Sequence, residues 1–159
     1  MAYIYPAPGV TDVEMTLGIS VEANSAATPE LSVPGLQDIT INAANDVFTW
    51  TQLDQASKLQ IATTATNSLG MNIVVDQTVF FGDTGETAGE ADYIGIWNLS
   101  KNKTKIDFEI YLGDTDGGAA GKTISGEGYI TGLAPTVSAD APVWVSPITI
   151  TVDGDYTVA

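Results

Sequence analysis

The spacing of hydrophobic residues between Asp83 and Leu112 changes from a helical period to a strand period. Small and apolar residues first recur every three or four positions, at Ala88, Ala91, Gly95 and Leu99. Apolar and polar residues then alternate, and the apolar positions are Ile106, Phe108, Ile110 and Leu112. The first spacing is typical of one side of a helix, and strict alternation is typical of a strand with one dry and one wet face. This stretch therefore predicts one helix followed by one strand.

The expected helix spans residues 86–101. Thr87 and Glu90 have the spacing of a capping box, in which both side chains accept hydrogen bonds from free backbone N–H groups at a helix start. Acidic residues in the first turns and lysines at the end follow the charge order that the helix dipole favours. The small residues would let this helix lie close against a sheet. Tyr93 and Trp97 fall on the opposite side.

Strand patterns fill most of the remaining chain. Alternation predicts strands at residues 13–22, 36–42, 47–53, 58–66, 69–76, 122–133 and 143–152. Turns are expected at Asn45-Asp46 and near Asn67-Ser68, which would give two separate hairpins. A helix over residues 55–65 is the alternative to a strand there. The fold class is therefore mainly β, with one flanking helix.

Glycine and proline mark irregularities in the last two predicted strands. Gly126 and Gly128 indicate a bulge or a close backbone approach. Pro147 coincides with a change in the phase of the apolar residues, which predicts a bulge or an edge position for the last strand.

The 159 residues are expected to form a single domain, 1–159. Its N-terminal arm, residues 1–12, is predicted to be extended because it contains two prolines; docking on a neighbour is favoured over a frayed terminus. A long loop is expected at residues 23–35, and it is either functional or a plain surface excursion. The candidates for contacts between subunits in these two segments are Tyr3, Ile4, Tyr5, Pro29, Leu31 and Val33.

The charge and the missing residue types exclude several functions. Twenty acidic residues against five lysines give a net charge of −15, which disfavours binding to nucleic acid or to anionic membranes. The chain has no Cys, His or Arg, so it lacks thiolates, the usual general base near neutral pH and the bidentate guanidinium fork. The first residues lack the basic and long apolar regions of a signal peptide, so we expect the protein to be made and kept in a cytoplasm.

The candidate motifs for catalysis, metal binding and cofactor binding are all incomplete in this sequence. The segment 114–118 begins like a calcium loop, but Ser125 stands where the twelfth-position Glu is needed. Gly121-Lys122-Thr123 ends like a phosphate-binding loop without its first glycine. Asp107 and Glu109 share a strand face, yet a carboxylate pair is unremarkable in so acidic a chain. We therefore expect no enzyme, no catalytic residues, no cofactor and no metal.

The remaining candidate for function is a contact surface on the predicted helix. Two aromatic rings on one side of the helix, Tyr93 and Trp97, form a patch that usually marks an interface. The alternative is that a loop of the same subunit covers them.

The order of these elements resembles the major tail tube proteins of long-tailed bacteriophages. The likeness in residue pattern lies in the helix-to-strand passage at Gly89 to Asp114, GEADYIGIWNLSKNKTKIDFEIYLGD, and in the ending at Gly128 to Ala159. The ending has a Gly-aromatic-Ile strand, a turn at Asp140-Ala141-Pro142 and a final strand that closes on Gly-Asp. The likeness in element order covers the whole chain.

This resemblance implies a β-sandwich or barrel-like tail tube fold that assembles into stacked hexameric rings around a channel for the genome. It implies a virion location, assembly in the host cytoplasm, and tape measure and tail terminator or tip proteins as partners. DNA would pass only transiently, without specific binding, and no membrane binding is expected. An acidic wall repels duplex DNA over about one Debye length, ~8–10 Å. The polar strand faces nominate as lumen-facing acids Glu14, Glu22, Asp107, Glu109 and Glu127.

Two other function classes stay open at this point. One is a capsid decoration or cement protein. The other is a β-sandwich carbohydrate-binding module with Trp50, Trp144 and Tyr156 as a sugar platform, although Trp50 and Trp144 fit a core better.

Overall fold

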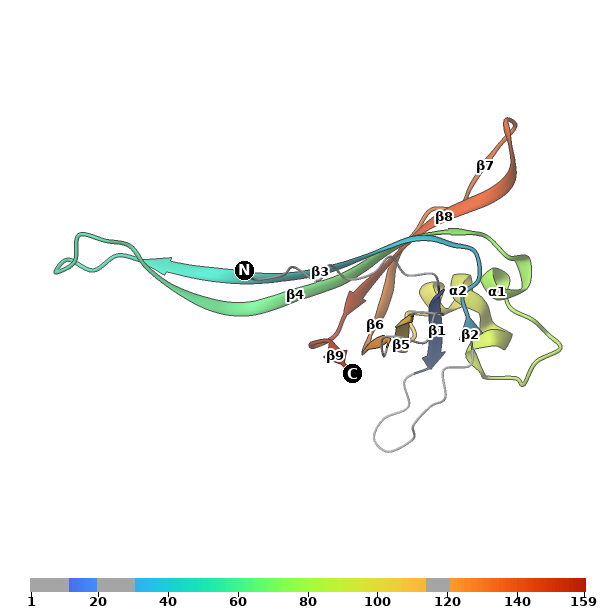
Figure 1. Ribbon diagram of the computed structural model, residues 1–159, viewed down its shortest axis with the longest axis horizontal. Coiled ribbons are helices and arrows are strands. Elements are labelled where there is room, and N and C mark those ends of the chain that lie inside the picture. The colour runs from blue at the N-terminus through green and yellow to red at the C-terminus, as the bar shows by residue number, and fades with distance from the viewer. Residues whose placement is uncertain (1–11, 20–30, 114–120) are drawn as a thin grey trace, which may run out of the picture.

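The computed structural model describes residues 12–19, 31–113 and 121–159, with the side chains of Asp12 and Ala141 excepted. The described residues form nine strands in one antiparallel sheet and two helices (Figure 1). The strands are β1 Asp12–Ile19, β2 Leu31–Ser32, β3 Leu36–Trp50, β4 Leu59–Val74, β5 Ile106–Gly113, β6 Lys122–Leu133, β7 Thr136–Ser138, β8 Ala141–Val152 and β9 Thr157–Val158. The helices are α1 Gln77–Phe81 and α2 Ala91–Lys101. The mainly β fold class is confirmed.

The sheet is open, with the strand order β2-β1-β5-β6-β8-β4-β3. β7 pairs with β8, and β9 pairs with β6. The first half of β6 pairs with β5 and its second half pairs with β8, and Gly128 belongs to both pairings. A Cβ at Gly128 would lie 2.4 Å from the Thr151 carbonyl oxygen, which confirms the predicted close backbone approach. β2 and β3 are the two ends of this open sheet.

The core lies between the bent sheet and the two helices. Strands β1, β4, β5 and β8 supply alternate apolar side chains, and the helices add Phe80, Ile96 and Leu99. The alternation of β5 is confirmed, because Ile106, Phe108 and Ile110 are buried while Glu109 is exposed. The helices therefore seal one part of a core that the strands mostly build.

The predicted start of the helix is wrong by several residues. α2 begins at Ala91, and its N-cap Glu90 makes no side-chain capping bond, so the capping box does not form. Thr87 and Glu90 are joined only by a backbone bond of 3.1 Å. The intervening Gly89 has φ 100°, a turn conformation that bends the chain before the helix starts.

The helix is not alone, which is a second correction. α1 was not predicted because it has only five residues and three of them are Val or Phe, which favour strands. Asp76 caps it by accepting bonds from the backbone N–H groups of Thr78 and Val79, at 3.0 and 3.1 Å. The small-residue side of α2 faces α1: a Cβ at Gly95 would lie 2.2 Å from the backbone N of Gly82.

The two predicted hairpins are one long hairpin, formed by β3 and β4 and joined by residues 51–58. Asn45-Asp46 marks a register shift between Asn45 and Val47 instead of a turn. Asn67 and Ser68 lie inside β4 and pair with Ala43 and Asn42. Cross-strand pairing has overridden the local turn preferences. The alternative helix at 55–65 is also wrong, because β4 begins at Leu59.

The last long strand, β8, is an interior strand, so the edge alternative for Pro147 is wrong. The register of β8 with β4 shows no shift at Pro147 either. β6 ends at Leu133 and β7 begins at Thr136, and Pro147 lies beside the gap between them. A residue without an N–H is tolerated there because no strand residue pairs with Pro147 on the β6–β7 side, although Asn72 of β4 lies opposite it on the other side.

Several expectations fall on other parts of the chain. The N-terminal arm up to residue 11, most of the 23–35 loop and Glu22 lie outside the described residues. The end of that expected loop is strand β2, which pairs with β1. Among the described helices none is long and apolar enough to cross a membrane.

Candidate functional site

One face of the sheet gathers the predicted acidic residues. The register places Asp107 opposite Glu127, Glu109 opposite Thr16, and Glu14 opposite Tyr111. These four carboxylates therefore project from the same face of β1, β5 and β6, away from the core. Glu14 and Glu109 are exposed.

Lys105 forms ion pairs at one end of the carboxylate face, the name we give to the surface that carries Glu14, Asp107, Glu109 and Glu127. Lys105 Nζ lies 2.6 Å from Glu127 Oε2 and 3.0 Å from Asp153 Oδ2. Hydrogen bonds to Glu127 and then to Asp153 raise the pKa of Lys105 above its usual value. The alternation of the strand placed Lys105 on this face, but it did not reveal that Asp153, which follows the last long strand, is its second partner. The net charge is therefore strongest on the β1 side of the face.

The β3–β4 hairpin projects from the body as an arm (Figure 1). The apolar residues of its outer part are exposed: Phe48 by 59%, Ile61 by 55% and Leu53 fully. Phe48 lies opposite Ile61, and Trp50 lies opposite Leu59, so these four side chains share one face. The rings of Phe48 and Trp50 are stacked, with centroids 6.0 Å apart. We call these four residues the arm face.

The arm face is not a continuation of the core-facing side of the hairpin. Ile41 of β3 pairs with buried Leu69 on the core side, and Phe48 and Trp50 fall on the other face of β3. The register shift between Asn45 and Val47 places an extra residue in β4, which reverses the phase of its alternation before Ile61 and Leu59. The arm face is therefore an exposed apolar surface of its own, separate from the core side of the sheet.

The C-terminal segment fixes the base of the arm. The hydroxyl of Tyr156 donates to the carbonyl oxygens of Ser68 and Asn42, at 2.8 and 3.0 Å. Asn67 is 3% exposed, and its side-chain amide donates to Gly154 O at 3.0 Å and to Asp155 Oδ1 at 3.3 Å. The Tyr156 ring also packs edge-on against Phe108 of the core. These contacts hold both strands of the arm where they leave the body.

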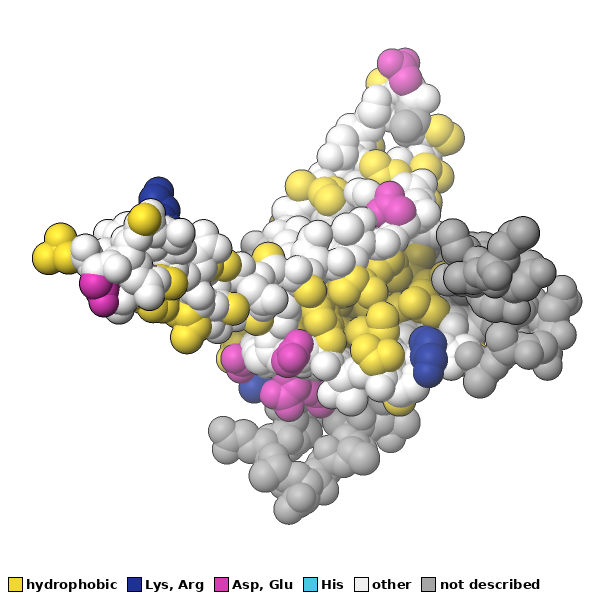
Figure 2. All heavy atoms as spheres, turned by 60° about the vertical axis from the view of Figure 1, so that its left-hand side comes forward, with side chains coloured by type: hydrophobic (Ala, Val, Ile, Leu, Met, Phe, Trp, Pro, Cys, Tyr) yellow, Lys and Arg dark blue, Asp and Glu magenta, His cyan; other side chains and the backbone are white. Residues whose placement is uncertain are grey.

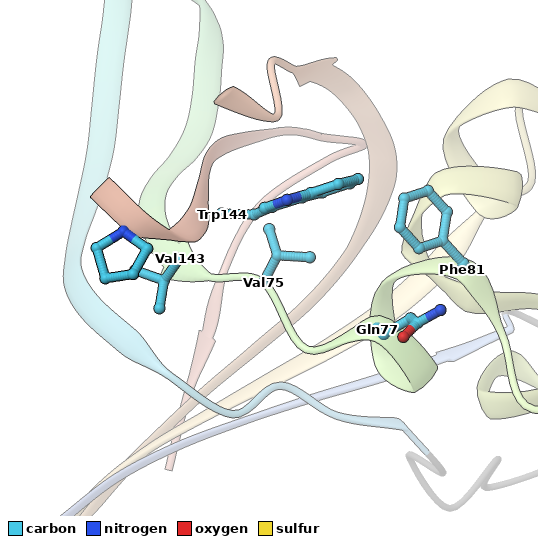
Figure 3. Close-up of a pocket in the computed structure, with 6 residues that line it drawn as sticks. Val75, Gln77, Phe81, Val143 and Trp144 are labelled. Carbon is cyan, nitrogen blue, oxygen red and sulfur yellow. The ribbon is translucent and has the colours of Figure 1, made fainter. Parts of the chain in front are cut away.

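Aromatic rings from α1 and β8 line a cleft of about 420 Å³. Its lining is Val75, Gln77, Phe81, Pro142, Val143 and Trp144. Phe81 and Trp144 meet edge to face at 6.0 Å, and Figure 3 shows the two rings beside each other above Gln77. Phe81 also contacts Trp97, at 6.3 Å between centroids. Phe81 therefore lies between the exposed Trp97 ring of α2 and the start of β8, which forms the other wall of the cleft.

The predicted exposure of the α2 rings is confirmed. Tyr93 is 36% exposed and Trp97 is 40% exposed, although the Trp97 ring packs in part against Phe80 and Phe81 of α1. The expectation that Trp50 and Trp144 fit a core is wrong: Trp144 is 43% exposed, and Trp50 is half-buried on the arm. Leu31 and Val33 instead lie in the subunit's own core, at 2% and 4% exposure. Figure 2 shows hydrophobic side chains along the arm and on the body below the β7–β8 hairpin.

Metal chemistry finds no support in this part of the chain. The described residues contain no group of three or more acidic side chains placed to hold a metal ion. Among the described residues, every buried polar side-chain atom has a hydrogen-bond partner. The candidate site is therefore a set of surfaces: the carboxylate face, the arm face and the aromatic cleft.

No protein-family model and no curated protein matches the sequence. Solved structures do match it. A chain of the SPP1 tail tube aligns with a TM-score of 0.59 at 15% identity, over 92% of this chain and 76% of that one. The chain has the fold of a tail tube.

Two other solved structures share this tail tube fold over nearly their whole length. A chain from the sheath/tube terminator of an extracellular contractile injection system aligns with a TM-score of 0.62 at 15% identity, covering 99% of both chains. A chain from the virion of a native gene transfer agent aligns with a TM-score of 0.61 at 13% identity, covering 96% of this chain and 99% of that one. At these identities the comparison concerns the fold, and the resemblance seen in the sequence is confirmed at that level.

Proposed function

We propose that this chain is a structural virion protein, the repeating subunit of a phage tail tube, and not an enzyme. The observation that carries the proposal is the arm. It exposes an apolar and aromatic face on a hairpin, and the described residues of the same subunit leave much of that face open. Such a surface is a liability for a protein that stays monomeric, and copies of the same chain can cover it.

The open sheet supports the same proposal. β3 pairs only with β4 among the described strands, and its outer edge is long. Long exposed edges invite pairing with another chain, and closing a sheet across subunits removes them. In a ring, each copy supplies the strand that its neighbour lacks. Stacked rings, hexameric as the resemblance implies, then form a tube in the virion tail.

The carboxylate face is the proposed lining of the channel. Four acidic residues on one sheet face, in a chain with net charge −15, repel the phosphates of a passing duplex. DNA then passes without being held. Tape measure and terminator or tip proteins are the further partners that this role requires.

Analytical ultracentrifugation and electron microscopy at increasing protein concentration test the proposal. Six-fold rings or hollow tubes are expected. A protein that stays a monomer or trimer at every concentration would contradict it and favour a decoration protein. A sugar platform receives no support from geometry, because Trp50 lies on the arm, Trp144 at the cleft and Tyr156 at the base of the arm.

Charge reversal tests the channel lining separately. Tubes of the Glu14→Lys, Glu109→Lys double variant should retain fluorescent duplex DNA at low salt, while wild-type tubes release it. The control is Asp54→Lys, which changes the charge in the loop at the arm tip. Retention by the control alone would remove the carboxylate face from the channel.

A further inference from the structure

The described residues leave two apolar surfaces uncovered, and these surfaces lie apart. The arm face consists of Phe48, Trp50, Leu59 and Ile61. The aromatic cleft lies at the other end of the molecule, beside α1 and the base of β8 (Figures 1 and 3). Each of these apolar surfaces can be covered either by the other one or by a partner molecule.

The arm cannot fold back onto its own cleft. Its base is held by the Tyr156 hydroxyl on one side and by the Asn67 amide on the other, and it points away from the helices (Figure 1). Bending it back would break these bonds and the β4–β8 pairing beside them. Within residues 12–19, 31–113 and 121–159, the cleft and the arm face of one copy therefore cannot cover each other.

Charge favours a second copy at these two places. Copies of a chain with net charge −15 repel each other, so they attract only where both surfaces lack carboxylates. None of the six residues that line the cleft is charged, and neither is any residue of the arm face. The cleft is large enough for an aromatic side chain, and five of its six lining residues are apolar or aromatic, the exception being Gln77.

We propose that the arm of one copy docks its Phe48–Trp50 face in the Phe81–Trp144 cleft of a second copy. This inference rests on the proposed self-assembly and names the surfaces that join. The two surfaces differ, so the contact is heterologous: each copy offers one arm and one cleft. Repeating such a contact gives closed rings or open helical stacks, the two arrangements from which a tube is built.

Cysteine cross-linking tests the contact directly, because the chain has no cysteine of its own. Phe48→Cys protein is mixed with Val143→Cys protein under mild oxidation, since Phe48 is on the arm face and Val143 lines the cleft. A mixed disulfide dimer is expected. A single chain carrying both substitutions should give a ladder of dimers, trimers and longer species, because the contact is heterologous.

Val47→Cys is the matched control on the arm. Val47 is 53% exposed, nearly as much as Phe48, but it lies on the opposite face of β3. The Val47→Cys and Val143→Cys mixture should form about tenfold less mixed dimer. Equal yields from both mixtures would mean random collision and would overturn the proposal.

A second measurement separates this inference from the proposed function. Phe48→Asp changes an exposed side chain, so the subunit folds, and it should raise the concentration needed for assembly by about tenfold or more. Tyr129→Ala, which removes an exposed ring on β6 away from the arm and the cleft, should leave that concentration unchanged. Normal tubes from Phe48→Asp, with no specific cross-link, would overturn the docking and leave the tube. Failure of the wild-type protein to assemble would overturn both.

Fluorescence gives an independent signal on the same samples. All three tryptophans lie on these surfaces or beside them: Trp50 on the arm face, Trp144 in the cleft and Trp97 next to Phe81. Docking should shift their emission to shorter wavelength as assembly proceeds. Assembly without a shift would contradict the proposal.

Discussion

At the scale of single residues, two glycines, Gly82 and Gly95, let the backbones of the two helices pass close to each other. Gly95 has φ 77° inside α2, and a Cβ there would lie 2.2 Å from the backbone N of Gly82. The glycine therefore interrupts the helix and lets α1 and α2 touch. The kink has no other apparent cause, since α2 contains no proline.

Gly95→Ala should lower the free energy of unfolding by about 3 kcal/mol, because it adds both a strained φ and a backbone clash. Gly89→Ala is the control: its φ is 100°, but nothing lies within 4 Å of the added Cβ. It should cost about 1 kcal/mol, from the strain alone. Urea denaturation of the monomer measures both, and equal costs would show that the packing of the helices does not depend on Gly95.

Tyr156 links the C-terminal segment to the arm, so its hydroxyl should matter for both. Tyr156→Phe should lower the free energy of unfolding by about 1 kcal/mol and speed hydrogen exchange at the base of β3 and β4. Tyr111→Phe, on an exposed side chain, is the control. Unchanged exchange in Tyr156→Phe would mean that the arm is held by strand pairing alone.

The same hydroxyl predicts a pH dependence. Burial raises the pKa of Tyr156 above its usual value near 10. The unfolded chain then loses this proton first as the pH rises, so the stabilisation is complete below about pH 10 and is lost through the higher folded pKa. The free-energy difference between wild type and Tyr156→Phe should therefore shrink above about pH 10. A difference that grows with pH would contradict this assignment.

At the scale of elements, the arm should be dispensable for the fold of the body. Replacing residues 45–65 by Asn-Gly joins Ala44 to Thr66, which are opposite each other in the register. The free energy of unfolding should change by less than about 1 kcal/mol, since a two-stranded hairpin without cover contributes little. Assembly should be lost. A body that no longer folds would show that the arm belongs to the core.

The elements also show what the sequence could and could not predict. β5 was predicted correctly because its own alternation matches its burial, and no distant partner was needed. The hairpins were misjudged because Asn45-Asp46 and Asn67-Ser68 carry turn chemistry that pairing overrides. A signal was available: the apolar series of β4 keeps odd numbering from Leu59 to Ile73, without the change of phase that a turn brings.

Of the three candidate surfaces, only the carboxylate face could be predicted, because it follows from the alternation of polar and apolar residues within single strands. Four acidic residues could be placed on one face because alternation fixes the side of each strand on which they lie. The pairing of β1, β5 and β6 then brings these sides together. The aromatic cleft could not be predicted, because it brings together α1, a helix with weak local preference, and β8, some 60 residues later. The arm face required the length of the hairpin, which the false turns concealed.

At the scale of the whole molecule, charge opposes assembly and apolar surface promotes it. Every copy carries a net charge of −15, and only five lysines offset its acids. The two uncovered apolar surfaces lie at opposite ends, so copies can join without bringing their carboxylate faces together.

Salt should therefore promote assembly. Raising ionic strength from about 0.01 M to 0.15 M shortens the Debye length from about 30 Å to about 8 Å, which screens repulsion between copies. The concentration needed for assembly should fall, as sedimentation or light scattering can measure. A rise with salt would mean that ion pairs, and not apolar contacts, hold the copies together.

Copies of this chain should supply the neighbours that one copy lacks, and a cryo-EM map of the assembled protein at a resolution that shows strands can decide this. We expect a hollow tube in which the outer edge of β3 pairs with a neighbouring copy, and Glu14 and Glu109 line the channel. A tube with the β3 edge open to solvent, or with these carboxylates on its outer surface, would contradict it.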